Sequence, residues 1–463
     1  MRDRFVERSH ALAAVQDAQS TANRIREYLA NGLDDELRAF VDQHHPADLA
    51  DAMQFLSDSE DLSLYRRLTS EEAAEVLDEV GETTRTALVR ATESDRLAEI
   101  LGYLPSDEGA DLLGALSPED RVAVFGHITD LSLRAELARL VGYPADTAGG
   151  VMSLGYVDVD MGSTQAGAIA RFRDKKNAEH IFFVYVVDAA GRLIGMVDLR
   201  TLLTASSETP LSELWDDQVV TVQPDCDQEQ VAGIFARYDL TALPVVDLDR
   251  RLLGVITADD IIDVIQEEAD EDVAHMVGSD ASELERKSPA KIAMMRMPWI
   301  MATLFIELFA GIVIKFFDHT IAQVLLLASF MPIISAISGN TGLQSAAIII
   351  RGLSTGHVRL NDWRHAVARQ LGTTLILGAA CGIVLGIIGA LWYGKWTFGV
   401  LVTVGMFMSV NIAGAVGTAI PLTSKRLGFD PALTAGPFET AFQDVVGISI
   451  FLGMATLLLP WLK

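Results

Sequence analysis

Five apolar stretches in the C-terminal part constrain this 463-residue chain more than any other feature. As a helix, each is long enough to cross a hydrocarbon layer of about 30 Å. They cover residues 292–317, 321–350, 366–392, 396–421 and 431–461. Tryptophans lie near the ends of these stretches, as in the aromatic belts at membrane interfaces: Trp299, Trp363, Trp392, Trp396 and Trp461. The sequence therefore predicts an all-α transmembrane domain of five helices over residues 291–463.

Charge divides the chain at the start of this domain. Of the 63 acidic and 36 basic residues, only 6 acidic but 13 basic ones lie at residue 286 or later, so that part carries +7 and the first 285 residues carry −34. A region this acidic attracts cations and repels nucleic acid, which is therefore not an expected partner. The acids could bind cations or could only keep the region soluble. Their positions in the chain have to decide between these two interpretations.

The distribution of bases predicts the orientation in the lipid bilayer. With the acidic region inside, the inner flanks hold ten bases: Arg286, Lys287, Lys291, Arg296, Arg351, Arg359, Arg364, Arg369, Lys425 and Arg426. The outer flanks hold Lys315, Lys395 and Lys463. This bias predicts a multi-pass protein of the cell (inner) membrane with cytoplasmic N-terminal domains and, after five spans, the C-terminus outside. The N-terminus has no apolar signal segment, and Cys226 and Cys381 lack metal-ligand spacing.

Residues 1–145 are expected to form an all-α, superhelical, acidic repeat domain. A 48-residue repeat aligns the apolar residues Leu49, Met53, Phe55, Leu56, Leu68 and Val76 with Leu97, Leu101, Tyr103, Leu104, Leu116 and Val124. Repeated helix pairs stack into a solenoid. Many acids of this domain stand at predicted helix starts, as in TSEE from Thr69 and SPED from Ser117, where capping explains them without a ligand.

Residues 146–266 show two βαββα-like units. The second unit has the helix VAGIFARYDL, the strands LPVVD and RLLGVI, and then TADDIIDVI; the first has FFVYVVD and RLIGMVD. This pattern resembles an α/β tandem pair of cystathionine-β-synthase (CBS) domains. In such pairs a Thr and an Asp after the last strand hold a nucleotide ribose. Thr257 and Asp260 fit that spacing, whereas the first unit has Asp198 and Thr201, so the resemblance supports at most one adenylate (ATP) site.

Residues 267–290 are predicted to be an acidic connecting helix leading to the first span. The acids of this region crowd about three helical turns, where like charges four residues apart repel one another. A bound divalent cation would offset the repulsion, and a solvated linker is the alternative.

In this order, the four parts resemble the MgtE family of magnesium channels over almost the whole chain. The most specific motifs are MPIISAISGNTGLQSAA at residues 331–347 and DPALTAGPFETAFQDVVGI at residues 430–448. The resemblance implies a homodimeric, Mg²⁺-selective channel for magnesium uptake. It also implies that Mg²⁺ bound to the acidic cytosolic domains closes the pore, with the connecting helix as its plug.

The pore prediction centres on Asp444. Among the acids of the last three spans, only Asp444 lies well inside an apolar segment, where an unpaired carboxylate costs about 2.5–3.5 kcal/mol unless it faces water or a partner. Mg²⁺ keeps much of its water shell and takes oxygen ligands. Gly339, Asn340 and Gln344 would offer close backbone approach and amide oxygens, while Glu307 is expected to serve helix packing.

Regulatory Mg²⁺ ligands follow from the resemblance alone. They are Glu75, Asp107, Asp111, Glu229, Asp239, Asp260, Asp263, Glu268, Glu271, Asp272 and, at the inner mouth, Asp430. Two other interpretations stay open: transport of another divalent cation such as Co²⁺ or Ni²⁺, and a nucleotide-sensing membrane protein. An enzyme is not expected, because the sequence has no HExxH, GxSxG or GxxxxGK[ST] motif.

Overall fold

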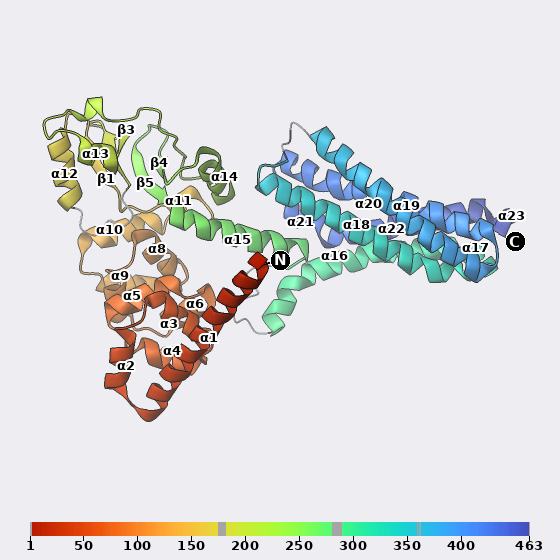
Figure 1. The fold of residues 1–463 in the computed structure, drawn as a ribbon, viewed down its shortest axis with the longest axis horizontal. Coiled ribbons are helices and arrows are strands. Elements are labelled where there is room, and N and C mark those ends of the chain that lie inside the picture. The colour runs from red at the N-terminus through yellow and green to blue at the C-terminus, as the bar shows by residue number, and fades with distance from the viewer. Residues whose placement is uncertain (1, 175–181, 280–288, 359, 361–362, 463) are drawn as a thin grey trace. The chain divides into compact units, whose positions relative to one another are not determined.

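The computed structural model describes residues 2–174, 182–279, 289–358, 360 and 363–462. The chain forms two compact units, Met1–Val264 and Ile265–Lys463 (Figure 1). Part of the predicted connecting segment, residues 280–288 with Arg286 and Lys287, lies outside the described residues, as does Arg359.

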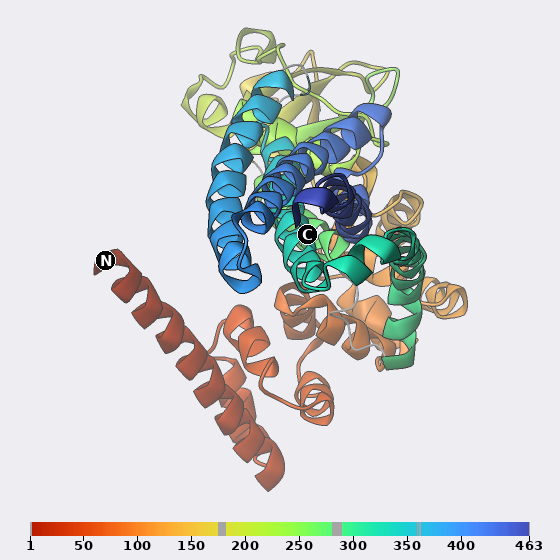
Figure 2. The ribbon, with the colours of Figure 1, turned by 90° about the vertical axis from the view of Figure 1, so that its right-hand side faces the viewer.

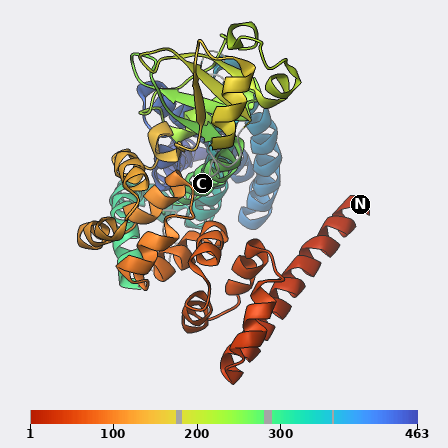
Figure 3. The same ribbon diagram turned by 90° about the vertical axis from the view of Figure 1, so that its left-hand side faces the viewer.

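The N-terminal part of the first unit is entirely helical in its described residues. Its helices are α1 (Arg2–Asn31), α2 (Asp34–Val41), α3 (Pro46–Met53), α4 (Asp58–Tyr65), α5 (Ser70–Glu79), α6 (Glu82–Arg90), α7 (Ser94–Ile100), α8 (Ser106–Gly114), α9 (Pro118–His127), α10 (Leu131–Leu140) and α11 (Ala148–Val151). From α3 to α10 the helices begin at residues 46, 58, 70, 82, 94, 106, 118 and 131. The predicted 48-residue repeat therefore contains four helices, and Figure 3 shows the repeat region as the red to orange short helices.

Local chemistry explains these short helices. Thr69 accepts from the Glu72 backbone N–H while the Glu72 carboxylate accepts from the Thr69 N–H, a complete capping box. The Ser117 hydroxyl caps α9 by accepting from Asp120 N–H. Most aligned repeat positions are buried, but Phe55 and Tyr103 are 37% and 52% exposed. Both residues follow the last turn of a helix.

Two small sheets follow. Their elements are β1 (Val157–Asp160), α12 (Gln165–Asp174), β2 (Phe183–Val187), β3 (Leu193–Asp198), α13 (Leu199–Thr204), the 3₁₀ helix η1 (Leu211–Glu213), α14 (Gln228–Tyr238), β4 (Ala242–Val246), β5 (Leu252–Thr257) and α15 (Ala258–Met276). Strand β2 pairs parallel with β1 and antiparallel with β3, and β4 pairs antiparallel with β5. Buried side chains of both sheets, such as Tyr185 and Val255, share one apolar cluster. The α/β pair predicted from the sequence is confirmed.

Helix α15 differs from the prediction. It continues without a break from Ala258 to Met276, so the boundary expected between residues 266 and 267 falls inside one helix. No proline or glycine interrupts these residues, and nothing local ends the helix before Gly278, whose φ of +71° stops it.

The second unit is helical (Figures 1 and 2). Its helices are α16 (Pro289–Phe316), α17 (Asp318–Gln323), α18 (Leu327–Ser354), α19 (Trp363–Tyr393), α20 (Trp396–Leu427), α21 (Pro431–Ala435), α22 (Pro437–Leu457) and α23 (Leu459–Leu462). Among the described residues, α16, α18, α19 and α20 are long and apolar enough to span a membrane. Helix α22 has a shorter apolar stretch, Ala441–Leu457. The fifth predicted span is divided because Gly436 and Pro437 separate α21 from α22.

Glycines bring the helices of this unit into close contact. A Cβ atom on Gly386 of α19 would lie 2.6 Å from the Gly399 carbonyl oxygen of α20, and the reverse distance is also 2.6 Å. A Cβ atom on Gly417 of α20 would lie 2.3 Å from the Gly342 carbonyl oxygen of α18. Such small-residue contacts are typical of packed transmembrane helices. They hold α18, α19 and α20 together, with α22 packed on α18 and α20.

Candidate functional site

Asp444 lies where α16, α18 and α22 meet. It is half-buried on α22, and the Ser335 hydroxyl of α18 donates a hydrogen bond to its Oδ1. The carboxyl of Glu307, on α16, lies next to that of Asp444. No lysine or arginine forms an ion pair with Asp444 within the described part of the chain. The site therefore gathers hydroxyl and carboxyl oxygens, which are the ligands that hard cations prefer.

The other predicted pore residues do not all join this site within one chain. Gly339 is buried one turn after Ser335 on α18, whereas Asn340 and Gln344 are exposed. At 3.6 residues per turn, Asn340 and Gln344 lie about 140° and 180° around the helix from Ser335. Their amides therefore point away from Asp444 of the same chain and lie on an otherwise apolar, exposed face.

Two buried polar residues near Asp444 were missed by the sequence analysis. Glu439 and Gln443, both on α22, have fully buried side chains. Glu439 lies only two residues after Pro437, the first residue of α22, and was treated as the edge of a span. Its spacing of four residues from Gln443, which directly precedes Asp444, was the signal that could have identified the pair.

The predicted residue Asp430 stands at the inner end of this unit by the predicted topology. Its Oδ1 accepts from Ala432 N–H at 2.8 Å and thereby caps α21. Its Oδ2 is 3.1 Å from Nδ1 of His275, whose Nε2 is 3.6 Å from a Glu271 oxygen. Next to them, Met276 packs against Ala346, Ile350 and Ala432. The structure thus brings Glu271 and Asp430 to the two sides of one imidazole, that of His275.

A second group of acids gathers in the first unit. Asp107 is buried, one of its oxygens has no hydrogen-bond partner, and burial followed by the charge of Asp260 raises its pKa well above the usual range. Burial raises the pKa of Glu108 to about 7, although Arg85 donates to it at 2.9 Å. Burial also raises the pKa of Asp260. Asp111 is the fourth acid whose charge acts here. The structure thus brings together three of the predicted Mg²⁺ ligands, Asp107, Asp111 and Asp260. Glu108, which was not predicted, joins them.

Such a group of acids is costly without a cation. A carboxylate that is removed from water and placed beside others of the same charge resists ionisation, as the raised pKa values show. A divalent ion held among these oxygens, directly or through its water, would relieve the repulsion. Within the described residues, however, no three His, Cys, Asp or Glu side chains are arranged to hold one metal ion directly.

The predicted nucleotide residues are hydrogen-bonded to each other. The Thr257 hydroxyl donates to Asp260 Oδ2 at 2.6 Å at the start of α15. In the first CBS-like unit, Thr201 N–H donates to Asp198 Oδ1 at 2.9 Å, which caps α13. The two units thus place a Thr and an Asp at corresponding helix starts in reversed order.

The remaining predicted acids are dispersed. Glu75 lines a cavity of about 270 Å³ together with Asp42, His44 and Glu72. Glu229 and Asp239 stand at opposite ends of α14, and Asp239 adopts a left-handed φ of 50° as its C-cap. Asp263, Glu268 and Asp272 follow one another along α15. Asp263 is nevertheless close enough to Asp260 for its charge to raise the pKa of that carboxyl, after burial as the main cause.

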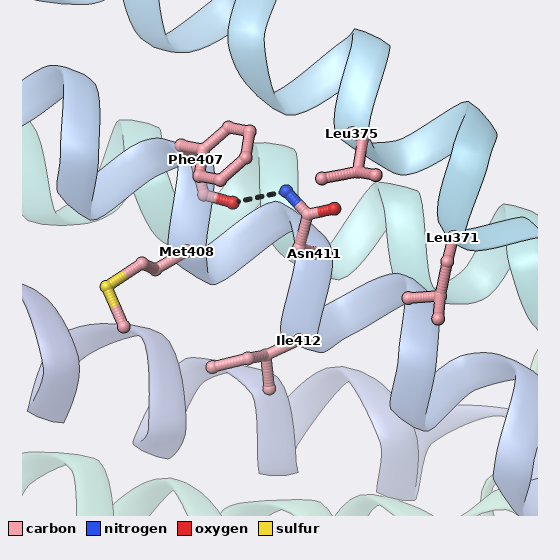
Figure 4. Close-up of a pocket in the computed structure, with 6 residues that line it drawn as sticks. All are labelled: Leu371, Leu375, Phe407, Met408, Asn411 and Ile412. Atoms are coloured by element: carbon pink, nitrogen blue, oxygen red, sulfur yellow. Dashed lines mark hydrogen bonds between the residues drawn. The ribbon is translucent and has the colours of Figure 1, made fainter.

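A cavity in the membrane unit does not suit a cation. It has a volume of about 340 Å³ and lies between α19 and α20 (Figure 4). Its lining is Leu371, Leu375, Phe407, Met408, Asn411 and Ile412. The only amide, that of Asn411, donates to the Phe407 carbonyl oxygen at 2.7 Å and accepts from Thr374. With its polar atoms used and no carboxylate in the lining, this cavity is an apolar recess.

Comparisons with known families agree with the order of the parts. The family MgtE, described as a divalent cation transporter, matches residues 331–454. The MgtE intracellular N domain matches residues 44–146, and the CBS domain matches residues 216–267.

Relatives of the whole chain are similar in length as well. Magnesium transporter MgtE of Thermus thermophilus is 35% identical over 95% of this chain and 99% of its own. Magnesium transporter MgtE of Bacillus subtilis is 30% identical over 94% of this chain and 96% of its own. A solved structure described as the cytosolic domain of the Mg²⁺ channel MgtE in complex with ATP is 36% identical. It covers 52% of this chain and 99% of its own, with a TM-score of 0.50.

Proposed function

Because the chain belongs to the MgtE family of magnesium transporters, we propose that it is a homodimeric, Mg²⁺-selective channel that mediates magnesium uptake. The observation that carries this proposal is Asp444, a half-buried carboxylate in the membrane unit with Ser335 and Glu307 as neighbours. A dication passing between two copies of Asp444 would meet two carboxylates. The inside-negative potential supplies about 2.3 kcal/mol per charge per 100 mV, twice that for Mg²⁺, so entry needs no other energy source.

The proposal includes five membrane crossings. Helix α22 has 21 residues and is about 31 Å long at 1.5 Å per residue, which matches the hydrocarbon thickness. Its polar first turns shorten the apolar stretch to Ala441–Leu457. With α22 as the fifth crossing, the N-terminal domains are cytoplasmic and the C-terminus lies outside.

The exposed face of α18 supports a second copy of the chain. Asn340 and Gln344 are exposed in the middle of a membrane-spanning helix, where polar side chains facing lipid are unfavourable. A symmetric partner would cover this face and bring both amides to the shared pore. Asn340 and Gln344, with Gly339, would then line the path of the hydrated ion near the two copies of Asp444.

Mg²⁺ binding to the acidic cytosolic domains would close the channel. Burial first, and then the charges of neighbouring acids, raise the pKa values of Asp107, Glu108 and Asp260 in the compact unit. A dication that binds the compact form more tightly than the open one would stabilise it. The other proposed ligands would act with them: Glu75, Asp111, Glu229, Asp239, Asp263, Glu268, Glu271, Asp272 and Asp430. Residues 267–290 would carry the change to the pore as its plug.

ATP is proposed as a ligand of the second CBS unit. The similar cytosolic domain named above was solved in complex with ATP, and Thr257 and Asp260 lie side by side at the start of α15. Because Asp260 also belongs to the acidic group with Asp107, nucleotide and Mg²⁺ would influence each other at this residue.

The direct test is Mg²⁺ flux into liposomes that contain the purified protein, read with an internal Mg²⁺ dye. Asp444→Asn should abolish the flux, because the amide removes the charge while keeping the shape. Asp318→Asn, an exposed position at the start of α17, is the matched control and should leave the flux unchanged. Unchanged flux in Asp444→Asn would refute the pore assignment, and equal rates for Co²⁺ or Ni²⁺ would refute Mg²⁺ selectivity. Limited proteolysis with and without millimolar Mg²⁺ tests the closing mechanism.

A further inference from the structure

Glu439 and Gln443 form an unusual polar pair inside the membrane unit. Both side chains are 0% exposed, and none of their four oxygen and nitrogen atoms has a hydrogen bond of regular geometry. The Gln443 amide is close enough to interact with the Glu439 carboxyl. Within the described residues, these are four of ten buried side-chain atoms without a partner. Buried polar atoms without partners are rare in native proteins and call for an explanation.

The pair lies inward of Asp444 along the same two helices. Ser335 of α18 contacts Asp444 of α22, and Gly342 of α18 contacts Glu439 of α22. Gly342 is seven residues after Ser335, and Glu439 is five before Asp444. At 1.5 Å per residue, the two contacts are about 7 to 10 Å apart along the helices. In the proposed topology, Glu439 therefore stands between Asp444 and the cytosol, one step further along the path.

Gly342 provides a slot that only a glycine permits. A Cβ atom built on Gly342 would be 1.9 Å from Glu439 Oε1 and 2.6 Å from its carboxyl carbon. On its other side, the Gly342 carbonyl oxygen is packed against Gly417. The carboxyl group of Glu439 thus rests directly on the backbone of α18, with no room for an ion on that side.

The start of α22 is also in contact with the end of α15. A Cβ atom on Gly436, three residues before Glu439, would lie 2.6 Å from the Met276 carbonyl oxygen and 3.0 Å from that of His275. The backbone that leads into Glu439 is therefore fixed by the last turn of α15. If that turn moves away, the first turn of α22 is released on this side.

From these contacts we propose that Glu439 and Gln443 form a second, inner binding site for a divalent cation, collapsed onto Gly342 in this structure and opened when the end of α15 leaves Gly436. The inference rests on the proposed Mg²⁺ pathway. In the open form, the Glu439 carboxylate and the Gln443 amide oxygen would turn toward the ion as it leaves Asp444. Oxygen donors of this kind suit Mg²⁺, which binds one or two carboxylates while keeping water. Successive weak sites are what conduction requires.

Helix packing alone explains the pair less well. A packing role favours small residues or side chains that complete their hydrogen bonds across the interface, and here neither side chain does so. A neutral Glu439 would satisfy packing as a glutamine would. Ion binding requires the negative charge of Glu439, whereas helix packing does not. The isosteric substitution Glu439→Gln therefore distinguishes the two roles.

The first experiment measures Mg²⁺ flux into liposomes with the full-length protein carrying Glu439→Gln. Loss of a charged ligand predicts a fall of about tenfold or more at limiting Mg²⁺, with normal elution of the purified dimer as the check on folding. A normal rate in Glu439→Gln beside an active wild type overturns the inner site and leaves the proposed function intact. An inactive wild type overturns the proposed function itself.

The second experiment measures access to position 439 and does not depend on flux. Glu439→Cys is introduced with Cys226→Ser and Cys381→Ser, and a charged thiol reagent is added from the cytosolic side with Mg²⁺ or with chelator. Labelling is expected to rise when Mg²⁺ is removed. Ala441→Cys, which is also buried but about 160° away around the helix, should stay unlabelled. Equal labelling of position 439 in both conditions would overturn the proposed opening.

Discussion

Asp61 offers a quantitative test of the packing in the N-terminal domain. Its side chain on α4 is 2% exposed and its Oδ1 has no hydrogen-bond partner in the described structure. Burial, and to a lesser extent Glu60, raises the pKa of Asp61 from 3.8 to about 6. The folded domain therefore binds this proton more tightly than the unfolded chain does. The resulting stability is fully present below pH 3.8 and is lost as the pH rises through about 6.

The magnitude follows from the shift. About two pKa units at 1.36 kcal/mol each correspond to about 3 kcal/mol of unfolding free energy lost between pH 4 and pH 8. Asp61→Asn removes this loss, because the amide does not titrate. We expect hydrogen exchange at the α4 amides of the full-length protein, corrected for intrinsic rates, to show the pH dependence in wild type and not in Asp61→Asn. Asp58→Asn, an exposed change on the same helix, should behave as wild type. A pH dependence that persists in Asp61→Asn would refute the argument.

Three further outcomes are expected. Thr69→Ala removes the hydroxyl that accepts from Glu72 N–H and should lower the protection of α5 amides by about 1 kcal/mol. Gly195→Ala places a Cβ atom 2.6 Å from the Asp216 carbonyl oxygen and should lower the unfolding free energy by about 1–3 kcal/mol, measured as a lower thermal midpoint. Because the pKa of Glu108 is raised to about 7 and bound metal requires the ionised carboxylate, the Mg²⁺ concentration that protects the cytosolic unit from proteolysis should rise as the pH falls from about 8 to 6. A constant concentration would contradict a role for this group of acids.

The sequence predicted those features that depend on local pattern. Apolar length identified the spans now seen as α16, α18, α19 and α20, and turn residues with apolar runs identified β2 to β5 within about one residue. Cap residues such as Thr69 and Ser117 placed helix starts correctly, because the hydrogen bonds involved join residues only three apart.

Features that depend on long-range packing were harder to predict. The contact of Glu439 with Gly342 joins residues 97 positions apart. The four-residue spacing of Glu439 and Gln443 could single out the pair, but it could not show that both side chains are buried. The same holds for Asp107 and Asp260, which were chosen by family resemblance and whose neighbour Glu108 was not. The exposed face that carries Asn340 and Gln344 depends on which side of α18 its neighbours cover.

The even spacing of helix starts from α3 to α10 has a consequence for how this domain can change in length. Helices two places apart pack on each other, as α3 does with α5, α5 with α7 and α7 with α9. Removing one consecutive pair, such as α5 with α6, would place α3 opposite α7 and keep odd helices facing odd ones. Whole pairs are therefore interchangeable building blocks, and a version of this domain that is shorter by one pair should still fold, whereas the loss of a single helix would mismatch every layer after it.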